Sequence, residues 1–231
     1  MGQLTNQEKL YKLFRIACAD LLVLQEMEWN GLLFDRENAE QYASELQTQI
    51  DELTRKWSVL IGKDCVSISS GKHVSAILYG GTLTEEHRIP AGYYKSGAKK
   101  GQVKYARADI EHVFPRLVDP MKNSESARGK QDDGSCTEWS VSEDNLKQLK
   151  AKGKAKELIK IVLEYRKLEK LRGTYLVGYP KLIDEKGWKG NMLHGQFNQT
   201  VAVTRRLSSS SPNLQNMDKE TKQFIVSRYA N

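Results

Sequence analysis

The chain has 231 residues, of which 39% are hydrophobic and 28% charged, a composition typical of a globular protein with a sizeable core. Its three cysteines are odd in number and widely spaced, which argues for free thiols in a reducing compartment and against a disulfide framework. No stretch approaches the roughly 18 apolar residues of a membrane span, and the first residues carry no export signal. We therefore expect a protein without a membrane partner.

The net charge of +7 is unevenly distributed along the chain. Residues 1–60 carry ten acidic and six basic side chains, whereas residues 88–107 carry six basic and no acidic ones. Residues 147–172 add ten basic side chains against three acidic ones. Such segregation suits a polyanion-binding surface, because each Lys or Arg placed on a phosphate releases condensed counterions. A solvated basic face explains the same charges equally well.

The first 62 residues predict two long helices. Residues 7–29 space apolar side chains three and four apart, and Asn30 with Gly31 then stops the helix. Asp35 is placed to cap a second helix that runs to Gly62 and packs against a partner helix. The apolar stripe of this second helix consists of Ala39, Tyr42, Ala43, Leu46, Ile50, Leu53, Trp57 and Leu60.

The middle of the chain changes in character. Residues 66–81 predict a short strand or turn, a Ser-capped helix and a glycine stop. The segment 82–140 is rich in Gly, Ser, Lys and Asp, which favours hairpins and mobile loops with little core. Ser140 or Ser142 then caps a further helix that begins near Glu143.

A lysine-rich run leads into another long helix with an apolar face from Leu158 to Tyr175, although Gly173 weakens the pattern near its end. From Trp188 the pattern changes to alternation, which predicts a strand pair over residues 192–203. A polar, turn-rich segment follows.

Three polar side chains, Arg166, Lys170 and Thr174, lie four residues apart on one stripe of this helix. Two cations and a hydroxyl in a row could follow successive phosphates of a DNA strand without reading its sequence. A solvated face with long side chains is the alternative interpretation.

Residues 204–216 place an arginine and hydroxyls before a proline-initiated turn rich in amides. Donors of this kind suit the minor groove, whose acceptors occur in every base pair. A plain polar loop has the same composition. The candidate side chains here are Arg206, Ser208, Asn213, Gln215 and Asn216.

Two of these segments resemble motifs of family A (DNA polymerase I type) DNA polymerases. Residues 196–216 resemble the palm signature FNQT-x-T-x-TGRLSS-x-x-PNLQN, and residues 164–175 resemble the thumb-helix motif EYR-x-L-x-KL-x-x-TY. Upstream, Glu26-Met27-Glu28-x-Asn30-Gly31 with Asp35 is similar to the E-M-E-x-x-G-x-x-x-D entry to the start of the thumb, and Ser67-Ile68-Ser69-Ser70 is similar to the N-x-N-S turn of the thumb. The insert at about 82–140 matches poorly, and Arg205 replaces a glycine of the signature.

The resemblance implies an α+β fold, mainly α, with long antiparallel thumb helices and a small antiparallel β piece of the palm at the C-terminus. Residues 1–36 would lead into the polymerase domain and residues 37–187 would form the thumb, with a basic insert at about 82–140. Residues 188–231 would form the N-terminal part of the palm.

Roles in DNA binding follow from the same resemblance. Arg166 and Lys170 would contact the duplex backbone, with Thr174 nearby. Arg206 would reach the minor groove at the primer terminus and help align the incoming nucleotide, and Asn213, Gln215 and Asn216 would hold the adjoining primer and template minor groove. Ser208 belongs to the same DNA-binding set.

The resemblance implies no catalytic residue and no metal site in this chain, since the aspartates that hold two Mg²⁺ ions belong to later motifs beginning with D-Y-S-x-x-E. By this resemblance the sequence would stop just short of that motif, and the fingers and the exonuclease domain would lie outside it. Four histidines, His73, His87, His112 and His194, are scattered without ligand spacing.

We therefore expect the DNA-binding thumb and palm portion of a DNA-directed DNA polymerase used in replication, phage-like and cytoplasmic in a bacterial cell or infected host. Its partners would be primer-template DNA and a polypeptide carrying the rest of the palm and the fingers, and Mg²⁺ would act in the completed polymerase. A natural split subunit and an excerpt of a longer protein remain alternatives, as does a non-catalytic duplex-binding module.

Overall fold

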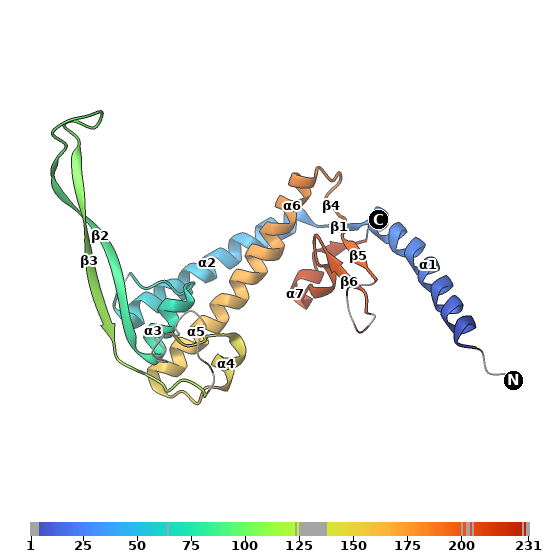
Figure 1. The fold of residues 1–231 in the computed structure, drawn as a ribbon, viewed down its shortest axis with the longest axis horizontal. Coiled ribbons are helices and arrows are strands. Elements are labelled where there is room, and N and C mark those ends of the chain that lie inside the picture. The colour runs from blue at the N-terminus through green and yellow to red at the C-terminus, as the bar shows by residue number, and fades with distance from the viewer. Residues whose placement is uncertain are drawn as a thin grey trace. The chain divides into compact units, whose positions relative to one another are not determined.

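A computed structural model, drawn in Figure 1, describes residues 5–63, 65–122, 124, 138–199, 201, 204, 206–227 and 229. The helices are α1 (Asn6–Asn30), α2 (Arg36–Ile61), α3 (Gly71–Tyr79), α4 (Glu143–Gln148), α5 (Gly153–Lys170), α6 (Gly178–Lys186) and α7 (Lys219–Lys222), with a π-helix at Leu171–Val177 and a 3-10 turn at Leu214–Asn216. The strands are β1 (Leu32–Phe34), β2 (Gly81–Tyr93), β3 (Val103–Phe114), β4 (Met192–Leu193), β5 (Gln196–Asn198), β6 (Ser208–Ser210) and β7 (Ile225–Val226). The expected α+β class, mainly helical with small antiparallel sheets, is confirmed.

The chain forms two compact units. Met1–Thr48 together with Leu168–Asn231 forms the first, here called the sheet unit, and Gln49–Lys167 forms the second, here called the hairpin unit. Helices α2 and α5 contribute residues to both units. The predicted domain limits at residues 36 and 187 stay a prediction. None of the helices that the structure describes has the length and apolar character needed to cross a bilayer.

Helix α2 forms where capping and periodicity predict it. The Asp35 carboxylate accepts the Asn38 backbone N–H at 3.2 Å, and so satisfies a donor that the first turn leaves unpaired. The apolar stripe is buried over most of its length, at Ala39, Ala43, Leu46, Ile50, Leu53 and Trp57. Trp57 is fully buried, and its indole N–H donates to the Val66 carbonyl at 2.9 Å.

The hairpin unit is built on α3 and on the long ribbon of β2 and β3. Ser70 caps α3 as predicted, by accepting the His73 backbone N–H. Strands β2 and β3 pair antiparallel from Gly81↔Phe114 to Tyr93↔Val103, which confirms a hairpin in the basic insert. All residues of β2 are described, and among them only Leu83 is buried. Most of this strand is therefore exposed. The loops expected at residues 125–137 lie outside the described residues.

The sheet unit has β1 at the centre of a three-stranded antiparallel sheet in the order β4-β1-β7. Leu32 pairs with Leu193 and Phe34 with Ile225. The predicted strand pair within residues 192–203 is wrong, because β4 pairs with β1 while β5 pairs with β6. Pairing with β1 leaves Leu193 fully buried, a gain that a hairpin of two short strands alone could not supply.

The second long helical stretch is not one α-helix. Helix α5 ends at Lys170, the π-helix spans Leu171–Val177, and α6 begins at Gly178. In a π-helix the hydrogen bonds join residues i and i+5. An added Cβ at Gly178 would lie 2.9 Å from the Gly173 carbonyl oxygen, so this wide turn requires a glycine at position 178.

Candidate nucleic-acid interface

A cleft of about 460 Å³ opens in the sheet unit between the π-helix with α6 and the 3-10 turn at Leu214–Asn216. It brings together four of the predicted DNA-binding residues: Lys170 and Thr174 from one wall, and Asn213 and Asn216 from the other. Lys170 and Thr174 are exposed, as a DNA-contacting lysine and hydroxyl must be. The cleft is also lined by Tyr175, Gly178, Tyr179, Lys181, Leu182, Glu185 and Pro212.

A buried tyrosine joins the two walls of the cleft. The Tyr175 hydroxyl donates to the Asn216 backbone carbonyl at 2.9 Å, and the ring packs edge-on against Tyr179 with 5.5 Å between centroids. Tyr175 is only 5% exposed, so this hydrogen bond is largely shielded from water. The helical wall and the turn are therefore held at a fixed separation.

The turn itself is fixed by side-chain hydrogen bonds. Asn213 Oδ1 accepts the Gln215 backbone N–H at 3.1 Å, and Ser209 Oγ accepts the Leu214 N–H at 3.3 Å. Ser209 Oγ also donates to the Pro212 carbonyl at 3.3 Å. A Cβ at Gly195 would lie 2.5 Å from Leu214 Cδ1 and 3.3 Å from the Pro212 carbonyl oxygen, so a larger residue there would displace the Leu214 side chain.

The cleft offers mainly hydrogen-bond donors and a positive charge. Two lysines, Lys170 and Lys181, stand against one acid, Glu185, which pairs with Lys181 at 3.7 Å. No side chain in the described ranges pairs with Lys170, whose ammonium group can therefore meet a phosphate. Sequence reasoning missed Lys181, although its spacing of seven residues from Thr174 was a signal of a shared helical face.

Arg166 lies in the hairpin unit and has a different environment. Its side chain is half-buried, and its guanidinium donates to the Val141 backbone carbonyl. Burial lowers the pKa of Arg166, which nevertheless keeps its charge at any physiological pH. One donor of this side chain is thus committed to the fold, and its predicted contact with DNA stays a prediction.

Three more predicted residues lie outside the lining of the cleft. Arg206 and Gln215 are exposed, and Ser208 is half-buried with its hydroxyl donating to the Asn198 carbonyl at 3.5 Å. Their contacts with DNA stay predictions. Arg205, at the position of the expected glycine, lies outside the described residues.

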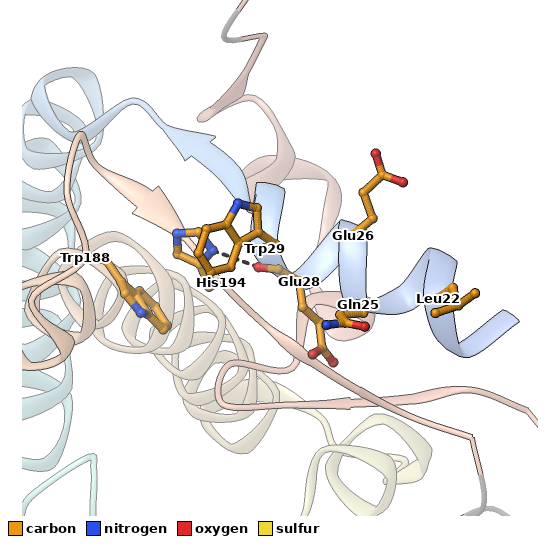
Figure 2. Close-up of a pocket in the computed structure, with 7 residues that line it drawn as sticks. All are labelled: Leu22, Gln25, Glu26, Glu28, Trp29, Trp188 and His194. Atoms are coloured by element: carbon orange, nitrogen blue, oxygen red, sulfur yellow. Dashed lines mark hydrogen bonds between the residues drawn. The ribbon is translucent and has the colours of Figure 1, made fainter. Parts of the chain in front are cut away.

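A second, larger pocket of about 700 Å³ lies between the end of α1 and β4 (Figure 2). Glu28 organises it: its carboxylate accepts the Phe197 N–H, and its carbonyl accepts the His194 Nδ1–H at 2.8 Å. The His194 ring packs edge-on against Trp188 at 5.2 Å. Glu28, part of the segment that resembles the start of the thumb, therefore fastens α1 to β5. The lining comprises Leu22, Gln25, Glu26, Glu28, Trp29, Trp188 and His194, without a predicted DNA-binding residue.

Helix α1 forms as predicted but exposes its apolar side chains. Within residues 6–30, all of them described, Leu24 alone is buried. Leu10 is 68% exposed, Phe14 64% and Trp29 84%. Most of the apolar side chains of α1 are therefore exposed to solvent in the described structure.

The described residues do not fit the Mg²⁺ ions of nucleotidyl transfer. Among them, one group of three potential ligands lies close together, and it consists of Cys65, Glu85 and His112. Mg²⁺ prefers oxygen ligands in octahedral geometry, whereas this group offers a thiol and an imidazole beside one carboxylate. No catalytic step can be derived from it.

Comparison with known proteins finds similar DNA polymerases. The sequence model of DNA polymerase family A matches residues 113–230, which is 118 of the 231 residues. DNA polymerase I of Geobacillus stearothermophilus is 27% identical over 195 residues, 84% of this chain and 16% of that protein. The thermostable DNA polymerase I of Thermus aquaticus is 44% identical over 73 residues, 32% of this chain and 8% of that protein.

A solved structure has the same fold. The POL domain of Pol1 from M. smegmatis, in complex with a DNA primer-template and dNTP, superposes with a TM-score of 0.56 at 22% identity. It covers 89% of this chain and 28% of that chain. The chain thus spans a small part of the length of each of these relatives. Because the family model covers half of its residues, this chain belongs to DNA polymerase family A.

Proposed function

We propose that this chain grips the primer-template duplex as part of a DNA-directed DNA polymerase used in DNA replication. The observation that supports this most is the cleft of the sheet unit, where Lys170 and Thr174 line the same space as Asn213 and Asn216. Its two walls are joined by the buried hydrogen bond of Tyr175, so in our proposal the backbone of the turn is already positioned when DNA binds.

The chemistry of these donors matches duplex DNA without sequence preference. The Lys170 ammonium suits a phosphate oxygen, and the amide groups of Asn213 and Asn216 suit the purine N3 and pyrimidine O2 acceptors of the minor groove. Because those acceptors occur in all base pairs, the contacts hold the duplex without reading it. Arg166 retains N–H groups beyond the one given to Val141 and would contact the backbone, while Arg206 would reach the primer terminus.

Nucleotidyl transfer requires carboxylates and Mg²⁺ that the described residues do not provide. In our proposal the rest of the palm and the fingers supply them, on a longer form of this chain or on a partner polypeptide. The exposed apolar face of α1, with Leu10 and Phe14, supports this, because the missing palm would cover it. Such an assembly would work in the cytoplasm of a bacterial cell or of a phage-infected host.

Binding to a fluorescent primed duplex at several salt concentrations tests the grip. Lys170→Ala should weaken binding and lower the slope of log K against log[salt] by about 0.9, the value for one lost phosphate contact. The matched control is Lys186→Ala, an exposed lysine on α6 that does not line the cleft. An unchanged slope in Lys170→Ala, or an equal change in the control, would remove the cleft from the interface.

Primer extension distinguishes a polymerase portion from a duplex-binding module that takes part in no reaction, even with a partner polypeptide. The chain is mixed with a polypeptide carrying the remaining palm and fingers, Mg²⁺, primed template and nucleotides. We expect more extension than the second polypeptide gives alone, and less when Lys170→Ala replaces the natural chain. Tight duplex binding without any gain in extension would favour the non-catalytic module.

A further inference from the structure

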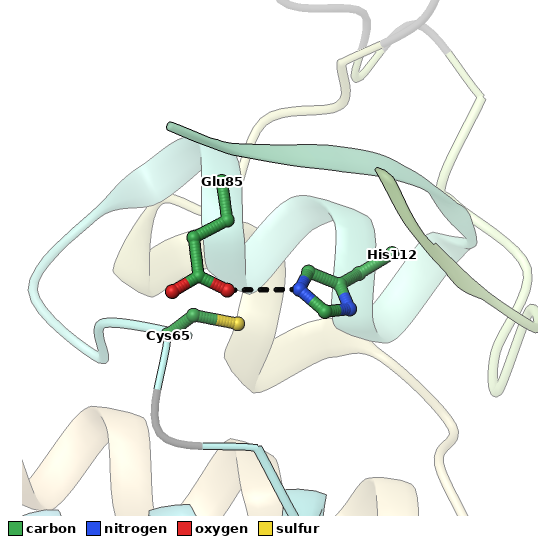
Figure 3. A group of neighbouring side chains, drawn as sticks. All are labelled: Cys65, Glu85 and His112. Carbon is green, nitrogen blue, oxygen red and sulfur yellow. Dashed lines mark hydrogen bonds and ion pairs between the residues drawn. The ribbon is translucent and has the colours of Figure 1, made fainter. Parts of the chain in front are cut away.

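The base of the β2–β3 hairpin gathers three side chains of the types that bind transition metals (Figure 3). Glu85 lies on β2, His112 lies on β3, and Cys65 follows α2. Their ligand atoms all lie within 4.8 Å of one another, and all three residues are half-buried. None of them belongs to the cleft that we propose for DNA.

Strand register explains how residues far apart in sequence meet here. Leu83 pairs with His112, and opposite residues of an antiparallel pair point to the same face. Glu85 follows Leu83 by two positions, so it projects from that same face as a diagonal neighbour of His112. Glu85 Oε2 and His112 Nε2 accordingly lie 2.9 Å apart. The loop after α2 then brings the Cys65 thiol to the pair, as Figure 3 shows.

We propose that Cys65, Glu85 and His112 form a Zn²⁺ site that fastens the hairpin to the segment following α2. Zn²⁺ takes sulfur, nitrogen and oxygen ligands at about 2.0–2.3 Å in tetrahedral geometry, which puts neighbouring ligand atoms about 3.3–3.7 Å apart. The three groups are already within 4.8 Å, so small side-chain rotations complete the geometry. The fourth position is left to water.

Zn²⁺ binding must be compatible with two neighbouring side chains, Lys63 and His87, which contact His112 and Glu85. The Lys63 ammonium donates to His112 Nδ1 at 3.0 Å, and His112 Nε2 in turn donates to Glu85. Zn²⁺ would replace the proton on Nε2, and His112 would then carry its proton on Nδ1, so Lys63 would leave that contact. Its long side chain already lies over the Phe114 ring at 4.9 Å. His87 pairs with the other oxygen of Glu85 at 3.1 Å and keeps the carboxylate oriented.

Cobalt spectroscopy on the reduced, tag-free protein tests the site, because a cysteine thiolate bound to Co²⁺ gives a charge-transfer band that other ligands do not. A Cys18→Ser/Cys136→Ser background leaves Cys65 as the only thiol in the chain. We expect this background to bind one Co²⁺ per chain with the thiolate band, to lose the band when Zn²⁺ is added, and to gain thermal stability with Zn²⁺.

Adding Cys65→Ser to the background should abolish the band and the rise in Tm. Glu85→Gln and His112→Ala should each weaken Zn²⁺ binding by at least roughly 10- to 100-fold. Loss of a residue that only supports a metal ligand already has an effect of this size. Circular dichroism of the metal-free variants checks that they are folded. Absence of a thiolate band in the folded background protein, or full affinity in folded His112→Ala, would overturn the proposal. Both readouts are independent of DNA binding.

Discussion

The cleft of the sheet unit and the β2–β3 hairpin both present lysines, but they hold them differently. In the cleft, Lys170 stands beside a turn that Tyr175 and Ser209 fix by hydrogen bonds. On the hairpin, Lys99 and Lys100 are exposed at the end of a ribbon, and no described acidic side chain pairs with them. The amides on that fixed turn can select the shape of a duplex, whereas exposed lysines without such a turn add only an attraction that salt screens.

Removing the core of the hairpin unit should give the largest effect on stability. Trp57→Ala deletes a fully buried indole and its hydrogen bond to Val66, and should lower the free energy of unfolding by about 3–5 kcal/mol. Urea unfolding followed by circular dichroism measures this. The control is Trp29→Ala, because that side chain is 84% exposed and its loss should change stability by less than about 0.5 kcal/mol. Equal losses in the two variants would contradict the assignment of the core.

A substitution that disturbs the turn should distinguish the contribution of the cleft to DNA binding from that of the hairpin. Gly195→Ala would place a methyl group 2.5 Å from Leu214 Cδ1 and 3.3 Å from the Pro212 carbonyl oxygen, so the Leu214 side chain of the turn must move, at a cost of up to about 1–3 kcal/mol. We expect affinity for primed duplex to fall several-fold. At Gly173, an added methyl group would meet nothing nearer than 3.8 Å, so Gly173→Ala should leave binding unchanged. Unchanged binding by Gly195→Ala would mean that the turn takes no part.

Neutralising the tip of the hairpin should affect only the electrostatic part of binding. Lys99→Ala with Lys100→Ala should lower the salt slope by up to about 1.8 if both lysines meet phosphates, with no change in stability. The preference for primed duplex over single-stranded DNA should persist. The double Arg variant keeps the charge and serves as the control. A lost preference would show that the hairpin, too, recognises shape.

The smallest effect is expected at the ion pair between Arg36 and Asp184 in the sheet unit. The guanidinium donates to both carboxylate oxygens, at 2.8 and 2.9 Å, and lowers the pKa of Asp184. A lowered pKa adds stability above the unfolded-state value of about 3.9 and loses it as pH falls through the folded value. Asp184→Asn should therefore lower Tm slightly at pH 7 and not at all in strong acid. A difference that grows in acid would show the opposite sign.

Local signals predicted the helices well. The Asp35 cap, the stripe of α2 and the Ser70 cap of α3 depend on residues within a few positions of one another, and all three are present. The apolar face of α1 was also predictable as a pattern. What covers that face is decided by segments outside the helix, so its exposure was not predictable.

Non-local pairing set the limit of prediction. Leu193 pairs with Leu32, which lies far earlier in the chain. The alternation of residues 192–203 predicts a strand but does not predict which strand pairs with it. The motifs nominated Lys170, Thr174, Asn213 and Asn216, and the fold brings these four to one cleft, while their contact with DNA stays a prediction. The meeting of Cys65 with His112 depends on hairpin register, which ligand spacing along the sequence cannot reveal.

The π-helix at Leu171–Val177 affects how the orientation of one cleft wall can change during evolution. Each residue of an α-helix turns the backbone by about 100°, and the wider i to i+5 bonding accommodates a supernumerary residue. Loss of a single codon in this stretch would let the helix close up and swing the Lys181 side of α6 around its axis by about that angle. A deletion of one residue can therefore change the orientation of the α6 wall without moving α5.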